Sequence, residues 1–263
     1  MSPVTYSLAN YRLLVDRALN GGYAFVPFNL EEIPQQGSIY LRHDVDYSLP
    51  LALELAKVNA EMNVPGTFFV LLRSHAYNLL SASSQAIVKE IYELGQHVAL
   101  HAVVDVSASD LIEKRLRSDF DFVRVNLPFI SPVFSWHNPT AELLDQTRSF
   151  DEIAGLMNVY SNRFTAGLTY RSDSNMRHGP DEFLRLIDAR PEHALQLLFH
   201  PLIWVLGGNN MTSVLAAVWP YLIKEQEKEM NQNNLYRNLL PEGMPDCLLM
   251  KFSESLLAKM ISQ

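Results

Sequence analysis

Residues 39–46 read Ile39-Tyr40-Leu41-Arg42-His43-Asp44-Val45-Asp46, an apolar run that ends in two carboxylates one residue apart. Side chains alternate faces along a strand, so Asp44 and Asp46 should project to the same side. A turn containing Pro50 and a helical pattern follow at once. Parallel α/β sheets carry their chemistry at the carboxyl ends of their strands, which predicts a reaction centre here. An Asp at such a junction can also cap the following helix, and the pair alone leaves that alternative open.

The composition limits the class of protein. The chain has 263 residues, of which 48% are hydrophobic and 19% charged, with a formal charge of −8. This acidic balance, without any run of Lys or Arg, argues against nucleic acid or an anionic membrane as partner. Cys247 is the single cysteine, which excludes an intrachain disulfide. Because we find neither a signal-peptide pattern nor 18 uninterrupted apolar residues, we expect a cytoplasmic protein without membrane insertion.

Strand and helix patterns alternate along the whole chain. The predicted strands lie at about residues 23–26, 39–46, 67–72, 98–100, 132–136, 168–173 and 195–199, and the predicted helices at about 11–18, 51–62, 84–94, 110–125, 141–147, 182–187 and 213–231. No linker or internal repeat interrupts this order, which predicts parallel βα units in a single domain over residues 1–263. Residues 1–38 would form an N-terminal extension, and residues 233–263 an amphipathic segment packed on the barrel exterior.

Five of the predicted strand ends carry ionisable side chains, namely Asp44 with Asp46, His101, His137, Asp173 and His200. One such ending is explained by capping, but five that converge on one face indicate a site. Imidazole and carboxylate together suit zinc or a similar first-row divalent ion, and the same groups can act as general base and acid. His43 should face away from the Asp pair. For His75, His97, His178 and His193 we expect structural roles.

Six short motifs occur in a fixed order along the chain. They are Arg42-His43-Asp44-Val45-Asp46, Gly66-Thr67-Phe68-Phe69, Leu94-Gly95-Gln96-His97-Val98-Ala99-Leu100-His101, Ser135-Trp136-His137-Asn138-Pro139, Tyr170-Arg171-Ser172-Asp173-Ser174-Asn175 and Leu197-Leu198-Phe199-His200-Pro201. This set, over about residues 40–204, resembles the polysaccharide deacetylase superfamily (carbohydrate esterase family 4), in particular a branch with an Arg-His-Asp-x-Asp signature. The resemblance implies an α/β fold, a distorted (β/α)7-type barrel, and metal-dependent removal of N-acyl groups from sugars.

The same resemblance implies the ligands of a divalent metal. His101 matches the first metal-binding histidine, Asp46 or a neighbour takes the carboxylate position, and His137 belongs to the third motif, where we expect a ligand. Zinc is the ion we expect first, with nickel, cobalt or iron as alternatives.

Three further residues match catalytic positions of the superfamily. Asp44 matches the aspartate that acts as general base, and His200 matches the histidine that protonates the leaving amine. Asp173 looks like the aspartate that orients this histidine. The expected substrate is an N-acyl sugar, such as a nucleotide-linked or lipid-linked precursor used in surface polysaccharide or lipopolysaccharide biosynthesis.

Some positions depart from the superfamily pattern. Gln96 replaces a common histidine, Asn138 replaces a basic residue, and the segment after His101 lacks the usual ligand, although Asp105 could supply one or could cap the next helix. Three hypotheses therefore remain: a deacetylase-like hydrolase, a catalytically impaired barrel that binds a glycan or partner, and an amidohydrolase that acts on a non-sugar amide.

Overall fold

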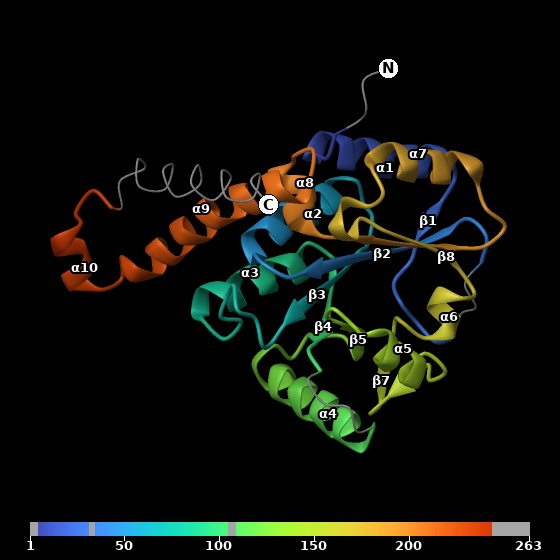
Figure 1. The fold of residues 1–263 in the computed structure, drawn as a ribbon, viewed down its shortest axis with the longest axis horizontal. Helices are drawn as coiled ribbons and strands as arrows, with labels where there is room; N and C mark the ends of the chain where they lie inside the picture. The colour runs from blue at the N-terminus through green and yellow to red at the C-terminus, as the bar shows by residue number, and fades with distance from the viewer. Residues whose placement is uncertain (1–4, 32–34, 105–108, 244–263) are drawn as a thin grey trace.

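The computed structural model describes residues 5–31, 35–104 and 109–243, and strands and helices alternate through these ranges (Figure 1). The strands are β1 (Ala24–Phe25), β2 (Ser38–Val45), β3 (Thr67–Leu71), β4 (His97–Ala102), β5 (Val133–Trp136), β6 (Glu152–Ile153), β7 (Leu156–Asn158), β8 (Thr169–Ser172) and β9 (Leu195–Phe199). The helices are α1 (Leu8–Asn20), α2 (Leu49–Glu61), α3 (Ala82–Glu93), α4 (Ser109–Asn126), α5 (Ala141–Thr147), α6 (Asn162–Thr165), α7 (Pro180–Ala189), α8 (Pro201–Leu206), α9 (Met211–Met230) and α10 (Asn234–Leu239). A short 3-10 turn, Ser174–Met176, follows β8.

The sheet has the strand order of a barrel that is open at one place. Parallel ladders join the strands in the order β7-β5-β4-β3-β2-β9-β8, which is the chain order of these strands arranged in a circle. Among the described residues no ladder joins β7 to β8, so the circle has a seam there. The short strand β1 pairs with the first residues of β2, and β6 pairs antiparallel with β7 at one end of the sheet. The prediction of an α/β fold of distorted (β/α)7 type is therefore confirmed.

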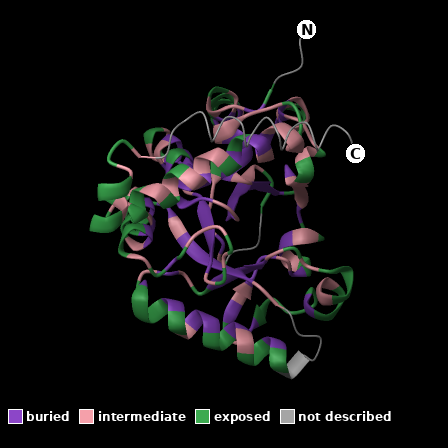
Figure 2. Ribbon diagram, turned by 60° about the vertical axis from the view of Figure 1, so that its left-hand side comes forward, coloured by how far each residue is buried: buried purple, intermediate pink, exposed green. Residues whose placement is uncertain are grey.

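The two faces of β2 meet different surroundings, as the alternation of side chains predicts. His43, on the outer face, contacts Tyr11 of α1 and Asn59 of α2. Arg42, on the inner face, contacts the ring of Phe69 on the neighbouring strand β3 and the ring of Tyr160, which follows β7. The central strands β2, β3, β4, β5 and β9 are almost entirely buried, whereas the outer sides of the surrounding helices are exposed (Figure 2). The inner face of β2 thus leads directly to the reaction centre predicted at its end.

An aromatic layer closes the barrel below that centre. Phe28 stacks on Tyr40 with ring centroids 5.0 Å apart, and Phe164 of α6 meets both rings edge-on at 5.3 and 5.5 Å. Phe69 of β3 joins the same group. Offset and edge-to-face contacts are the geometries that aromatic rings prefer. This layer fills the barrel beside the seam, because α6 lies on the connection from β7 to β8.

The helix after β2 begins at a serine and not at either aspartate. Ser48 is the N-cap of α2, and its hydroxyl accepts the backbone N–H of Leu51 at 3.3 Å. Pro50 stands in the first turn, where its missing N–H costs nothing. The helix therefore does not need Asp44 or Asp46 as a cap, and the alternative left open by the sequence is wrong for both.

The chain outside the central strands is partly integrated into the barrel. In the range predicted as an N-terminal extension, α1 packs against α7 and β1 pairs with β2. At the other end α9 extends away from the barrel and α10 lies at its far tip (Figure 1). Of the predicted packing segment 233–263, residues 244–263 lie outside the described residues. Within the described ranges, no helix has both the length and the apolar character needed to cross a membrane.

Candidate functional site

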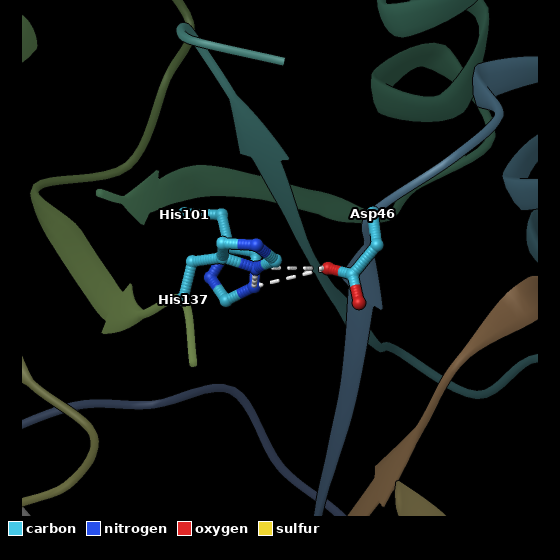
Figure 3. Close-up of side chains that lie close together, drawn as sticks. All are labelled: Asp46, His101 and His137. Atoms are coloured by element: carbon cyan, nitrogen blue, oxygen red, sulfur yellow. Dashed lines mark hydrogen bonds and ion pairs between the residues drawn. The ribbon is translucent and has the colours of Figure 1, made fainter. Parts of the chain in front are cut away.

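Asp46, His101 and His137 meet at one edge of the barrel, where β2, β4 and β5 end (Figure 3). Asp46 Oδ1 lies 3.2 Å from His101 Nε2 and 3.4 Å from His137 Nδ1. The two ring nitrogens are 3.3 Å apart. Three potential ligand atoms from three strands therefore form a nearly equilateral triangle.

The triangle has the size that a tetrahedral metal site requires. Bonds of about 2.0–2.1 Å to a tetrahedral ion place its ligand atoms about 3.3–3.4 Å apart. Asp46 Oδ1 is also buried without a conventional hydrogen-bond partner, which is costly unless a cation or donor meets it. Burial would raise the pKa of the Asp46 carboxyl, but its contacts with His101 and His137 outweigh burial and hold that pKa below its usual range. The donor set therefore fits a divalent ion such as zinc.

Neighbouring groups hold the two histidine rings in place. His101 turns Nδ1 toward Ser135, whose hydroxyl lies 2.7 Å away and whose carbonyl oxygen lies 3.3 Å away. This contact leaves Nε2 facing Asp46, which is the orientation expected of a ligand whose other nitrogen is hydrogen-bonded. The side-chain amide of Asn138 lies 3.1 Å from Nε2 of His137. Asn138, the position where the superfamily has a basic residue, thus contacts a candidate ligand.

Asp44 lies below this triangle in a buried ion pair. Both of its oxygens accept hydrogen bonds from Arg42, at 2.8 and 2.7 Å, and Asp44 Oδ2 is 3.5 Å from His101 Nε2. Burial would raise the pKa of the Asp44 carboxyl, but the Arg42 charge and hydrogen bonds lower it overall. Both side chains are almost wholly excluded from solvent. Asp44 is therefore ionised and held by Arg42, next to the candidate ligands.

His200, at the end of β9, faces Oδ2 of Asp46, whereas the two candidate ligand histidines face Oδ1. Its Nε2 lies 3.7 Å from Asp46 Oδ2, and its Nδ1 lies 2.6 Å from Oδ1 of Asp173. Burial alone would lower the pKa of His200, but the carboxylates of Asp173, Asp46 and Asp44 raise it to about 9. The imidazole is therefore protonated at neutral pH and can donate a proton from Nε2.

Asp173 is completely buried and accepts three hydrogen bonds. Besides the His200 ring, the backbone N–H of His200 and the indole N–H of Trp204 bind its Oδ2, each at 2.9 Å. Trp204 stands on α8, a helix that the sequence interpretation did not predict. Its position four residues after His200 matches one helical turn, and that spacing was the available signal.

A cavity of about 370 Å³ opens above these groups. Asp46, His137 and His200 line it, together with Arg73 and His75 from the loop after β3. His75, for which a structural role was expected, therefore borders the site. Asp44, Asp173 and His101 are not part of the cavity lining and stand behind it. Asp105 lies outside the described residues.

Comparison with known proteins gave structural matches only. No protein-family model matches the chain, and no curated protein matches it. A deacetylase from Streptococcus pyogenes, solved with acetate, is 12% identical over 71% of this chain and 99% of its own, with a TM-score of 0.44. A family 4 acetyl xylan esterase from Clostridium thermocellum, solved with cobalt, is 15% identical over 71% of this chain and 84% of its own, with a TM-score of 0.43.

A carbohydrate esterase family 4 pseudoenzyme from Bacillus anthracis also matches. It is 17% identical over 73% of this chain, with a TM-score of 0.42. The chain spans 62% of that protein and 65% of a mutant of it with restored enzymatic activity, which is less than two thirds of their length.

Proposed function

We propose that this protein is a metal-dependent hydrolase that removes an N-acyl group from a sugar. One observation carries the proposal. Three ligand atoms, spaced as a tetrahedral metal ion requires, and the protonated side chain of His200 lie next to each other at one cavity. Amide hydrolysis needs both parts, because water must be activated and the departing amine must receive a proton. The resemblance of the sequence motifs to sugar deacetylases supports the choice of an N-acyl sugar.

Asp46, His101 and His137 are the residues that would hold the metal ion. A divalent ion, when bound, supplies Lewis acidity at this edge of the barrel. Mixed imidazole and carboxylate donors at tetrahedral spacing favour zinc, with nickel, cobalt or iron as alternatives. Ser135 contributes by holding the His101 ring in the orientation that a ligand needs.

Asp44 and His200 are the proposed proton-transfer groups. Asp44, held by Arg42, accepts the proton of the attacking water, and His200 donates a proton from Nε2 to the amine nitrogen as the C–N bond breaks. Asp173 keeps Nδ1 of His200 protonated, so that Nε2 is the nitrogen that exchanges protons with the substrate. A role in surface polysaccharide or lipopolysaccharide biosynthesis is a finer proposal that rests on the motif resemblance.

The test combines metal analysis with an acetate-release screen. We expect one divalent ion per chain after purification, a lower content in Asp46→Asn, and an unchanged content in His75→Gln, which borders the same cavity outside the triangle. Acetate should be released from N-acetyl sugars by the metal-loaded protein. Equal metal content in both variants would overturn the ligand assignment.

The screen also separates the two alternative functions. Metal retention without acetate release from any N-acetyl sugar, but with turnover of a cyclic ureide or imide, would identify a different amidohydrolase. Absence of metal and of turnover, with binding of a glycan, would identify a catalytically impaired barrel.

A further inference from the structure

A second cavity adjoins the candidate site. It has a volume of about 630 Å³ and lies between α9 and the loop that follows β3. Tyr47, His75 and Ala76 line both cavities. One ligand can therefore occupy both cavities and stay in contact with the protein along its length. We refer to the second cavity as the α9 groove.

The described lining of the α9 groove is mainly apolar and contains no Lys or Arg. One face of α9 supplies Trp219, Leu222, Ile223 and Met230, which recur at helical spacing. The opposite wall consists of Leu72, Ser74, Ala76, Tyr77 and Asn78, and the far end of Gln226, Glu227 and Tyr236. Among the described lining residues Glu227 is the one acidic group, and it accepts a hydrogen bond from the hydroxyl of Tyr236 at 3.0 Å. The phosphates of a nucleotide would find no Lys or Arg among the described residues of this lining, whereas an uncharged aliphatic chain needs none.

Large apolar side chains are left in contact with water along this groove. Trp219 is 43% exposed and Met230 is 52% exposed. In the rest of the protein, the other two tryptophans, Trp136 and Trp204, are fully buried. Exposed apolar side chains that are grouped beside a candidate catalytic cavity are typical of a binding surface, because large contiguous apolar patches are rare on the surface of a protein.

The groove is fixed relative to the candidate site. The Tyr77 hydroxyl donates to the carbonyl oxygen of Val45 at 2.8 Å and accepts the N–H of Leu71 at 2.7 Å. These two bonds attach the wall of the groove to the ends of β2 and β3, one residue before Asp46. A substrate bound in the groove would therefore be positioned with respect to the candidate metal ligands.

We propose that the α9 groove binds an aliphatic aglycone, so that the substrate is an amphiphilic N-acyl glycoside with its sugar in the first cavity. The sugar half of this inference rests on the proposed function. The aliphatic half rests on the lining of the groove and on its continuity with the first cavity.

The test measures binding of a chain-length series to the full chain by titration calorimetry. The probes are methyl, butyl, hexyl and octyl glycosides of N-acetylglucosamine, each kept below its micelle-forming concentration. A buried methylene contributes about 0.8 kcal/mol, so we expect the affinity to rise about two- to fourfold for each methylene in this partly open groove. A series with constant affinity would overturn the proposal.

Trp219 provides a direct signal of occupancy. Because the other two tryptophans are buried, a blue shift of emission on adding the octyl glycoside, absent with the methyl glycoside, should come from Trp219. The shift should disappear in Trp219→Phe. Persistence of the full shift in that variant would place the bound chain elsewhere.

Paired charge substitutions identify the groove. Met230→Glu and Trp219→Glu should reduce the gain in affinity from methyl to octyl, since a carboxylate in the groove opposes an apolar chain. Val125→Glu is the matched control, because Val125 is 83% exposed on α4, which contributes nothing to the groove. An equal reduction in all three variants would overturn the proposal.

Octyl glucoside, which has no acyl group, separates this inference from the proposed function. If octyl glucoside binds more tightly than methyl glucoside but no N-acetyl glycoside releases acetate, the groove assignment stands and the proposed function fails. If methyl and octyl N-acetylglucosaminides release acetate with equal kcat/KM and bind equally, the proposed function stands and the groove assignment fails.

Discussion

The indole N–H of Trp204 donates a 2.9 Å hydrogen bond to Oδ2 of Asp173, the oxygen that also accepts the backbone N–H of His200. These bonds fix the carboxylate so that Oδ1 alone faces the His200 ring, at 2.6 Å. The edge of Tyr6 packs on Trp204 from the other side, with ring centroids 4.9 Å apart. The orientation of the proposed proton donor therefore depends on a tryptophan that does not touch the cavity.

Trp204→Phe should lower kcat by about tenfold with little change in KM, since one hydrogen bond to a charged group is worth about 1.5–3 kcal/mol. Tyr23→Phe is the control, because Tyr23 is also buried and loses its O–H bond to the carbonyl oxygen of Ile187, away from the site. Equal losses of kcat in the two variants would show that Trp204 acts only through stability.

His200→Ala should lower kcat/KM by about 10²–10⁴, the usual contribution of a positioned acid. Asp173→Asn should cost less, because it changes the orientation and charge of the imidazole without removing it. Metal content, measured on the same samples, should match that of the unmodified protein in both variants. A normal rate in His200→Ala would remove the acid role.

Asp44→Asn should destabilise the fold by about 3–5 kcal/mol, because it leaves the charge of Arg42 buried without its partner. The double variant Arg42→Leu/Asp44→Leu should recover most of that loss in urea unfolding but stay inactive. The exposed pair Arg17–Asp188 serves as comparison, and Asp188→Ala should cost less than about 1 kcal/mol. Recovery of activity in the double variant would exclude Asp44 as the base.

Acid should weaken the fold through His43. Burial lowers the pKa of His43 to about 3, below its value of about 6.5 in an unfolded chain. Between these values the unfolded chain binds more protons, so the free energy of unfolding contributed by this group falls as pH drops below 6.5, by up to about 1.4 kcal/mol per pH unit. His43→Gln should flatten the dependence of unfolding free energy on pH. An unchanged dependence in His43→Gln would remove this imidazole as the cause.

The arrangement around Asp46 was accessible from the sequence because it follows from two regularities. Side chains two residues apart share a face, and the ends of parallel strands share an edge. The same alternation would have placed Arg42 beside Asp44, although the sequence interpretation did not use it. Trp204 required a helix of six residues after His200, which is too short to show a periodic pattern.

The seam of the barrel was inaccessible for a related reason. Strands β6 and β7 have two and three residues, and such lengths show neither alternation nor a continuous apolar run. The α9 groove depends on the direction in which a long helix leaves the barrel, and that direction is set by tertiary packing on α8.

The seam between β7 and β8 also determines where the circumference of the barrel can change. In a closed barrel the strand number and stagger determine the circumference. Because no ladder joins β7 to β8 in the described part of the chain, this barrel can widen there without breaking a backbone hydrogen bond between these two strands. The four strands that end in Asp46, His101, His137 and His200 all lie within the continuous run β5-β4-β3-β2-β9. A change in circumference would be absorbed around Phe164, on the far side of the ring, and the triangle of ligand atoms would keep its dimensions.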